Sequence, residues 1–252
     1  MLKLDILASL SCTENTQIIL RELQTYVKDG HEPFVCSAVR VVGQLADGDP
    51  AVAGNCMEGI MHLLLCTKNA SIIRECVVVL RQLLQQNVSS PSSVKILRQL
   101  AKLLIIEGGM EEPTARSSIV WLVGEFNHAL SDVSPDILRI LAAGFVQECT
   151  ETKTQILNLA VKLSVHLPDD EGVQLLMTYV LEMARYDLDT DLRDRSRFMT
   201  AIMGLAPSNE GDVDAPSVDE DALSELNEHA KGSSFFFPTM FCSVLFSCDA
   251  VN

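Results

Sequence analysis

The sequence predicts an all-α protein built from antiparallel helix pairs that stack as a curved solenoid. Two observations lead to this prediction. One apolar stripe recurs along the chain at a nearly constant interval, and no run of alternating apolar and polar residues indicates a strand. The composition agrees, because hydrophobic residues make up 48% of the chain while aromatic residues make up only 5%. A core of small and branched aliphatic side chains suits helix-on-helix packing.

The stripe is clearest in the segment Thr114–His128, where Ile119, Leu122, Val123 and Phe126 fall on one face of a helix. The same spacing returns in four other segments: Ala38, Val41, Val42 and Leu45; Cys76, Val79, Leu80 and Leu83; Leu157, Ala160, Val161 and Ser164; and, in a more polar copy, Ser196, Met199, Thr200 and Met203. Equivalent positions are 38, 43, 38 and 39 residues apart. This interval is close to the period of HEAT or armadillo repeats, in which each helical unit packs on its neighbours.

Six helices are expected before residue 110, each bounded by turn residues. They span residues 2–10, Thr16–Asp29, Glu32–Ala46, Val52–Cys66, Ser71–Gln86 and Val94–Ile106. Gly30 is expected to end the second helix, and the DGDP sequence at 47–50 separates the third from the fourth. Ser90 is expected to cap the sixth helix ahead of Pro91, and the glycine pair at 108–109 closes it.

Five further helices follow, which brings the expected total to eleven. They span Thr114–His128, Asp136–Glu148, Thr152–His166, Gly172–Arg185 and Thr190–Leu205. Pro113 suits the first turn of the helix that it precedes, because the missing N–H has no partner there. The segments SDVSP at 131–135 and PDD at 168–170 supply the intervening turns.

Composition divides the chain into three parts: residues 1–206 as the repeat domain, residues 207–231 as an acidic linker, and residues 232–252 as an atypical tail. The linker holds eight of the 34 acidic side chains and one basic one, and its composition allows a short helix over Glu220–Lys231. The tail carries five of the nine phenylalanines. With a net charge of −15, the chain is a poor candidate for sequence-independent nucleic-acid binding, which needs Lys and Arg to neutralise phosphates.

The eight cysteines form no CxxC pair, and we interpret them as small buried hydrophobic residues in a reducing compartment. The opening residues lack the apolar stretch of a signal peptide. The sequence also contains no run of about 20 apolar residues that could span a bilayer.

The strongest candidate for a metal site is the run of carboxylates Asp187, Asp189, Asp191 and Asp194. An EF-hand loop that began at Asp187 would need Gly at its sixth position and Glu at its twelfth, whereas this chain has Leu192 and Phe198. We therefore interpret the run as a helix N-terminus followed by an ion-pair cluster at Arg193–Asp194–Arg195.

No other motif indicates catalysis or cofactor binding. The five histidines are expected at the surface or at helix ends, and the adjacent Glu111 and Glu112 diverge from a helix start. No glycine-rich phosphate loop or nucleophile elbow occurs. Trp121 is the only tryptophan and has no counterpart in the other repeats, so we expect it in the core. The sequence therefore predicts a non-enzymatic protein with no catalytic, cofactor or metal site.

One helix gives a family resemblance. The segment Thr114–Glu125 resembles an ARxxxxWxxGE-like helix in the trunk domains of beta-adaptins, with Ala115, Arg116, Trp121, Gly124 and Glu125 as matching residues. QILNLAVKL at 155–163 and TDLRDRSRF at 190–198 extend the resemblance, the latter through Arg193, Asp194 and Arg195. The Ser-Arg-Phe that follows, with LRELQTYVKD at 20–29 and LSELNEHAKG at 223–232, is most similar to the beta subunit of adaptor protein complex 3.

This resemblance implies a trunk fragment of a large adaptor subunit, acting in a heterotetramer with delta, mu and sigma adaptins. Such complexes sit peripherally on Golgi and endosomal membranes and coated vesicles, on the cytoplasmic side, and sort cargo towards lysosomes or vacuoles. The match begins inside the solenoid, so Leu4, Ile6 and Leu7 are expected to lack a covering repeat. From Ser233 the chain departs from the family pattern.

Two other functions fit a helical repeat protein. The chain could serve as a HEAT-type regulatory subunit of a soluble enzyme such as a phosphatase. It could also be a nuclear-transport receptor, although the ladder of Trp and Asn residues typical of import armadillo proteins is missing. Copurifying partners distinguish these alternatives from an adaptor.

Overall fold

A computed structural model describes residues 2–12, 15–47, 50–87, 90–106 and 108–205. These residues form eleven α-helices and two 3-10 turns and contain no strand, which confirms the all-α prediction. The α-helices are α1 (Leu2–Ser9), α2 (Thr16–Tyr26), α3 (Glu32–Asp47), α4 (Pro50–Cys66), α5 (Ala70–Gln86), α6 (Pro91–Ile105), α7 (Pro113–Glu125), α8 (Ser134–Ala143), α9 (Thr150–His166), α10 (Glu171–Arg185) and α11 (Thr190–Ile202). The expected linker and tail lie outside the described residues.

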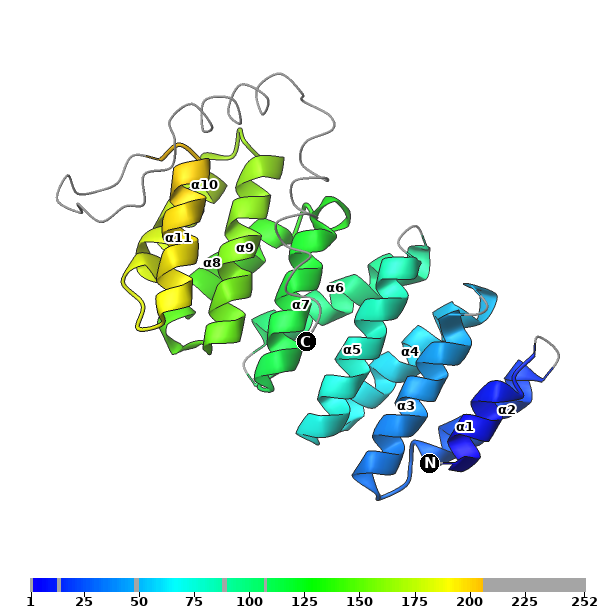
Figure 1. The fold of residues 1–252 in the computed structure, drawn as a ribbon. Helices are drawn as coiled ribbons and strands as arrows, with labels where there is room; N and C mark the ends of the chain where they lie inside the picture. Colours follow the sequence, from blue (N-terminus) through cyan, green and yellow to red (C-terminus); the bar gives the residue numbers. More distant parts are fainter. Residues whose placement is uncertain (1, 13–14, 48–49, 88–89, 107, 206–252) are drawn as a thin grey trace. The chain divides into compact units, whose positions relative to one another are not determined.

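The described helices group into two compact units, which divide after residue 133: α1–α7 form the first and α8–α11 the second. In the first unit, α1, α3, α5 and α7 form one row in which α3 packs against α1 and α5, and α5 packs against α7. A second row contains α4 and α6, which contact each other and pack against α5 and α7 (Figure 1). Alternate helices therefore share a row, as expected for stacked helix pairs.

The repeated stripe forms the core of the first unit. Ile119, Leu122 and Val123 are buried on α7, as is Phe126 at its C-cap, and Cys76, Val79, Leu80 and Leu83 are buried on α5. On α3 the copy is nearly complete, with Val42 only partly buried. Burial of the predicted stripe on all three helices confirms that the apolar spacing marks the core face.

The second unit repeats this arrangement with α9 packing against α8, α10 and α11, and α10 packing against α8 and α11. Nine consecutive residues of α9, Ile156–Ser164, are buried. That run includes Asn158, Lys162 and Ser164, so burial on α9 extends well beyond the predicted stripe.

Several helix boundaries differ from the predictions, among them the ends of the second, seventh and eighth helices. The second helix ends at Tyr26, and Val27 rather than Gly30 is its C-cap. The predicted helix Thr114–His128 ends at Glu125 and continues as a 3-10 turn over Asn127–Ala129. The predicted helix Asp136–Glu148 breaks at Gly144, before a 3-10 turn over Phe145–Gln147.

Caps and turns agree better with the sequence at α6. Gly108 adopts a positive φ of 72°, a left-handed conformation that suits glycine at a helix end. Ser90 is the N-cap of α6 as predicted, but its hydroxyl lies 2.6 Å from that of Ser92 and makes no side-chain cap bond to the helix.

Leu4, Ile6 and Leu7 of the first helix were expected to be uncovered, and this expectation is wrong for Leu4. This side chain is buried in a cluster with Ile19, Leu23, Ala38, Val41 and Leu45, while Leu7 packs against the same cluster. Ile6 is exposed, as expected. Leu4 is covered because α1 turns its inner face towards α3.

Candidate functional site

Of the five residues that carry the family resemblance on α7, two are buried, two are partly buried and one is exposed. Ala115 and Gly124 lie buried. Arg116 is partly buried, and its Nη1 donates a hydrogen bond to the Met110 carbonyl oxygen at 3.5 Å. Glu125 is exposed at the last turn of the helix. We find no arrangement of these side chains that would perform chemistry.

The α7 helix begins at a buried carboxylate. Glu112 is its N-cap, and its Oε2 accepts a hydrogen bond from the Ala115 backbone N–H at 2.6 Å. Its other oxygen, Oε1, accepts from Nη2 of Arg74 on α5 at 2.8 Å. One carboxylate therefore satisfies the start of α7 and ties it to α5.

Replacing Glu112 with Ala is expected to lower the free energy of unfolding by about 1–2 kcal/mol, mainly through loss of the N-cap. The ion pair with Arg74 adds little, because that guanidinium is half-exposed. Chemical denaturation followed by circular dichroism measures the change. Glu111→Ala is the matched control, since Glu111 is exposed and should change stability by less than about 0.5 kcal/mol. Equal effects of the two substitutions would rule out the capping role.

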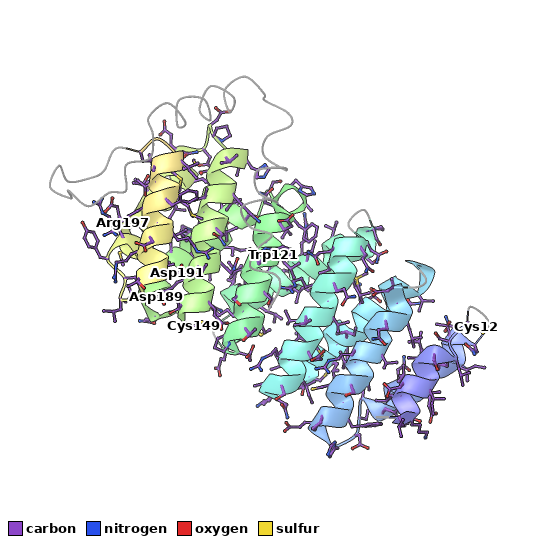
Figure 2. The ribbon with its side chains drawn as sticks, viewed as in Figure 1. Cys12, Trp121, Cys149, Asp189, Asp191 and Arg197 are labelled. Carbon is purple, nitrogen blue, oxygen red and sulfur yellow. The ribbon has the colours of Figure 1, made fainter. Side chains whose placement is uncertain are left out.

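Trp121 differs from its predicted place in the core. It is only partly buried, and the Arg81 guanidinium of α5 lies over its ring, 5.7 Å from the ring centroid. This contact is a cation–π interaction between adjacent helices of one row. Trp121 thus joins α5 to α7 at the surface, in the position labelled in Figure 2.

Other polar contacts link helices about one repeat apart. The Arg40 Nη2 on α3 donates to Glu75 Oε2 on α5 at 2.7 Å, and Lys95 on α6 pairs with Glu58 on α4 at 3.0 Å. The partners are 35 and 37 residues apart in sequence. Three of these four side chains are more than half exposed, so the pairs are expected to add little to stability.

The predicted helix N-terminus at the carboxylate run is confirmed. Asp189 caps α11, and its Oδ1 accepts the N–H groups of Asp191 and Leu192 at 2.9 and 3.4 Å. Figure 2 shows Asp189 and Asp191 at this end of α11, with Arg197 further along the helix. The Asp189 carboxylate therefore already serves the helix start.

The motif residues on α11 pair differently from the predicted cluster. Asp194 forms an ion pair with Arg197 at 3.3 Å, and Arg195 pairs with Asp191 at 3.8 Å. The Arg193 side chain instead donates to the backbone carbonyl of Asp187 at 2.8 Å. Residues three or four apart lie on the same face of a helix, whereas adjacent residues do not. The two ion pairs therefore follow helix geometry.

Asp187 forms an enclosed ion pair in the second unit. Its Oδ2 lies 2.6 Å from the Lys153 ammonium of α9, and each side chain is only 12% exposed. Burial by itself would raise the pKa of this carboxyl. Hydrogen bonds from Lys153 and from the Asp189 and Leu188 backbone outweigh burial and hold the pKa below its usual value. The Lys153 ammonium also lies 5.7 Å from the Phe145 ring centroid.

The cysteines divide by burial. Cys56 and Cys76 are buried as predicted, and burial raises their pKa values to about 11 and about 12. Cys12 and Cys66 are exposed, so the prediction that the cysteines are buried is wrong for these two. Cys242 and Cys248 lie outside the described residues.

The described histidines are exposed, as predicted, but one of them has a partner that the sequence analysis missed. His62 Nδ1 lies 3.7 Å from the Cys66 sulfur, one helical turn further along α4. The spacing of four residues was the available signal. Among the described residues, no group of three or more His, Cys, Asp and Glu side chains is arranged to hold a metal ion.

Large apolar side chains are exposed along the outer face of α10. Leu175 (73% exposed) and Tyr179 lie four residues apart on one side of the helix, and Tyr186, the C-cap residue just beyond it, is exposed as well. Exposed apolar groups that gather in this way are typical of protein-interaction surfaces, where tyrosine is enriched. No helix of the described residues is long and apolar enough to cross a bilayer.

Comparisons with known proteins agree with the resemblance. The family model for the adaptin N terminal region matches residues 1–207. The AP-3 complex subunit beta-2 of Mus musculus is 35% identical over 210 residues, which cover 83% of this chain and 18% of the mouse protein. The AP-3 complex subunit beta of Dictyostelium discoideum is 31% identical over 250 residues, covering 79% of this chain and 22% of that protein.

The fold also matches a solved structure. A chain described as part of a homology model of the full-length AP-3 complex in an intermediate open conformation aligns with a TM-score of 0.68 and 28% identity. The alignment covers 80% of this chain and 36% of that chain. This chain therefore spans about a fifth of the length of the curated relatives described above.

Proposed function

Because this chain belongs to the adaptin family, we propose that it is a non-enzymatic scaffold, part of the large beta subunit of an adaptor complex in vesicle-mediated protein transport. The observation that carries this proposal is the adaptin match over residues 1–207, which coincides with the helical repeat. Within the described residues, buried carboxylates and thiols serve caps, ion pairs and the core, which suits a scaffold.

The partners that we propose are the delta, mu and sigma adaptins of an AP-3-type heterotetramer. Through that complex the chain would associate peripherally with Golgi and endosomal membranes and coated vesicles from the cytoplasm, and would help to sort cargo towards lysosomes or vacuoles. The net charge of −15 supports protein partners over nucleic acid, because binding to phosphates requires clustered basic side chains.

We propose that another adaptor subunit contacts the exposed side chains at α10. This surface, called the α10 line, consists of Leu175, Tyr179 and Tyr186. Large exposed apolar and tyrosine side chains can supply binding energy when a partner removes them from water. In the free chain these side chains leave apolar surface exposed to water, and a permanent partner would cover it.

Copurification tests the proposed function. The full chain, co-expressed with the mu and sigma chains of an AP-3 complex, is expected to form a complex that survives size-exclusion chromatography. Capture of a phosphatase catalytic chain instead of adaptor subunits would support the regulatory-subunit alternative and contradict the adaptor assignment. Among the described contacts, no observation favours that alternative or a nuclear-transport receptor.

A paired substitution tests the contact surface separately. Replacing Leu175 and Tyr179 with Ser is expected to weaken the complex by roughly tenfold or more, since two anchor side chains are lost. Ile18→Ser is the matched control, because Ile18 is similarly exposed on α2 but lies in the other unit. If the wild-type complex forms and the double substitution leaves it intact, the proposed contact surface is contradicted, whereas the proposed adaptor function is not.

A further inference from the structure

His62 and Cys66 place two metal-binding side chains side by side on the outer face of α4. The Cys66 sulfur lies 3.7 Å from Nδ1 and 3.9 Å from Nε2 of the His62 ring. Both residues are exposed, so a cation can reach them from solvent without any opening of the core. The spacing of four residues on one helix holds them together.

Their separation suits shared coordination of one ion. Zinc binds cysteine sulfur at about 2.3 Å and histidine nitrogen at about 2.0 Å, so a tetrahedral ion holds the two atoms about 3.6 Å apart. The two side chains already stand close to that distance. A turn of the imidazole about its Cβ–Cγ bond, for which histidine has a broad energy well, aims a ring nitrogen at the ion.

The position on the helix adds electrostatic support. Cys66 is the last residue of α4, and the last turn of this helix carries no basic side chain. The free carbonyl groups at a helix C-terminus create negative potential, which stabilises a cation. This support is independent of the two ligands themselves.

We propose that His62 and Cys66 form a surface site for a thiophilic divalent cation such as Zn²⁺. The Cys66 thiol loses its proton to solvent as its sulfur binds the ion, and His62 binds through a neutral ring nitrogen. Water completes the coordination. Glu58, one turn earlier on the same helix, takes no part, because its carboxylate pairs with Lys95.

Protection of individual thiols tests this site in the full chain, with Zn²⁺ alone as the probe. Alkylation by iodoacetamide is followed cysteine by cysteine with peptide mass spectrometry. At a zinc concentration ten times the dissociation constant, modification of Cys66 is expected to slow about tenfold, because only the free thiol reacts. Cys12 is the internal control, since it is also exposed, and its described side-chain partner, Asn15, contacts its backbone N–H rather than its sulfur.

Two variants separate chelation from general thiol binding. His62→Ala is expected to abolish the zinc protection of Cys66, whereas His128→Ala, at another exposed histidine, should leave it unchanged. Addition of Co²⁺ to the wild type should produce a thiolate-to-cobalt absorption band that is lost in both Cys66→Ser and His62→Ala. Equal protection of Cys12 and Cys66, or full protection in His62→Ala, would overturn the proposal.

Discussion

Replacing Leu122 with Ala is expected to lower the free energy of unfolding of the first unit by about 2–5 kcal/mol. Leu122 is fully buried on α7, at the centre of the repeated stripe, and α7 packs against both α5 and α6. Truncation removes apolar contacts and leaves a cavity that these helices can close only in part. Denaturant titration monitored by circular dichroism gives the change, with intrinsic fluorescence of Trp121 on the same helix as a local probe.

Leu65→Ala is the matched control for this measurement. Leu65 also lies within a helix of the first unit, but it is 57% exposed, so its truncation should change stability by less than about 0.5 kcal/mol. A Leu122→Ala protein as stable as the Leu65→Ala protein would contradict the assignment of the stripe to the core.

Replacing Asp187 with Ala is expected to destabilise the second unit by about 3 kcal/mol, near the low end for one partner lost from a buried ion pair. The change leaves Lys153, whose side chain is 12% exposed in the wild type, without its carboxylate, and it also removes the acceptor of the hydrogen bond from the Asp189 backbone N–H. Lys153→Met should restore part of that loss when it is added to Asp187→Ala, because the unpaired charge is removed. A double-mutant cycle isolates the pair's coupling.

The control is Asp194→Ala, which removes one partner of an exposed ion pair on α11 in the same unit. The Asp194 side chain is 74% exposed, so the expected loss is below about 1 kcal/mol. Additive effects of the Lys153 and Asp187 substitutions would contradict direct coupling of the two side chains.

The difference in stability between the wild type and Asp187→Ala depends on pH, because the pKa of Asp187 is lowered in the folded chain. The ordinary carboxyl pKa is 3.8, and the folded value lies below it. At a pH above 3.8 the carboxyl is ionised in both states, and the folded chain keeps the full benefit of the pair. As the pH falls through the folded pKa, the carboxyl is protonated and the benefit is lost. The stability gap between wild type and Asp187→Ala should therefore narrow only in acid.

The positions of the helices were predictable from the sequence because helix formation depends on local features. The apolar spacing on α3, α5, α7 and α9 identified their core faces. Gly108 and Asp189 marked helix ends, the first through its positive φ and the second through side-chain bonds to the first turn of α11. The family resemblance could likewise be found in the sequence, because its motifs on α7, α9 and α11 each lie within a single helix. The His62–Cys66 pair belongs to this local class as well, since its spacing lies within one turn of α4.

Contacts between repeats were decided only by the tertiary structure. Trp121 meets Arg81 and Lys153 meets Asp187 across separations of 40 and 34 residues, and the burial of Leu4 depends on where α1 settles against α3. Such contacts require the register between helices to be known within about one turn, or 5.4 Å. Loop lengths and the packing of side chains set that register, whereas helical periodicity within one segment carries no information about it.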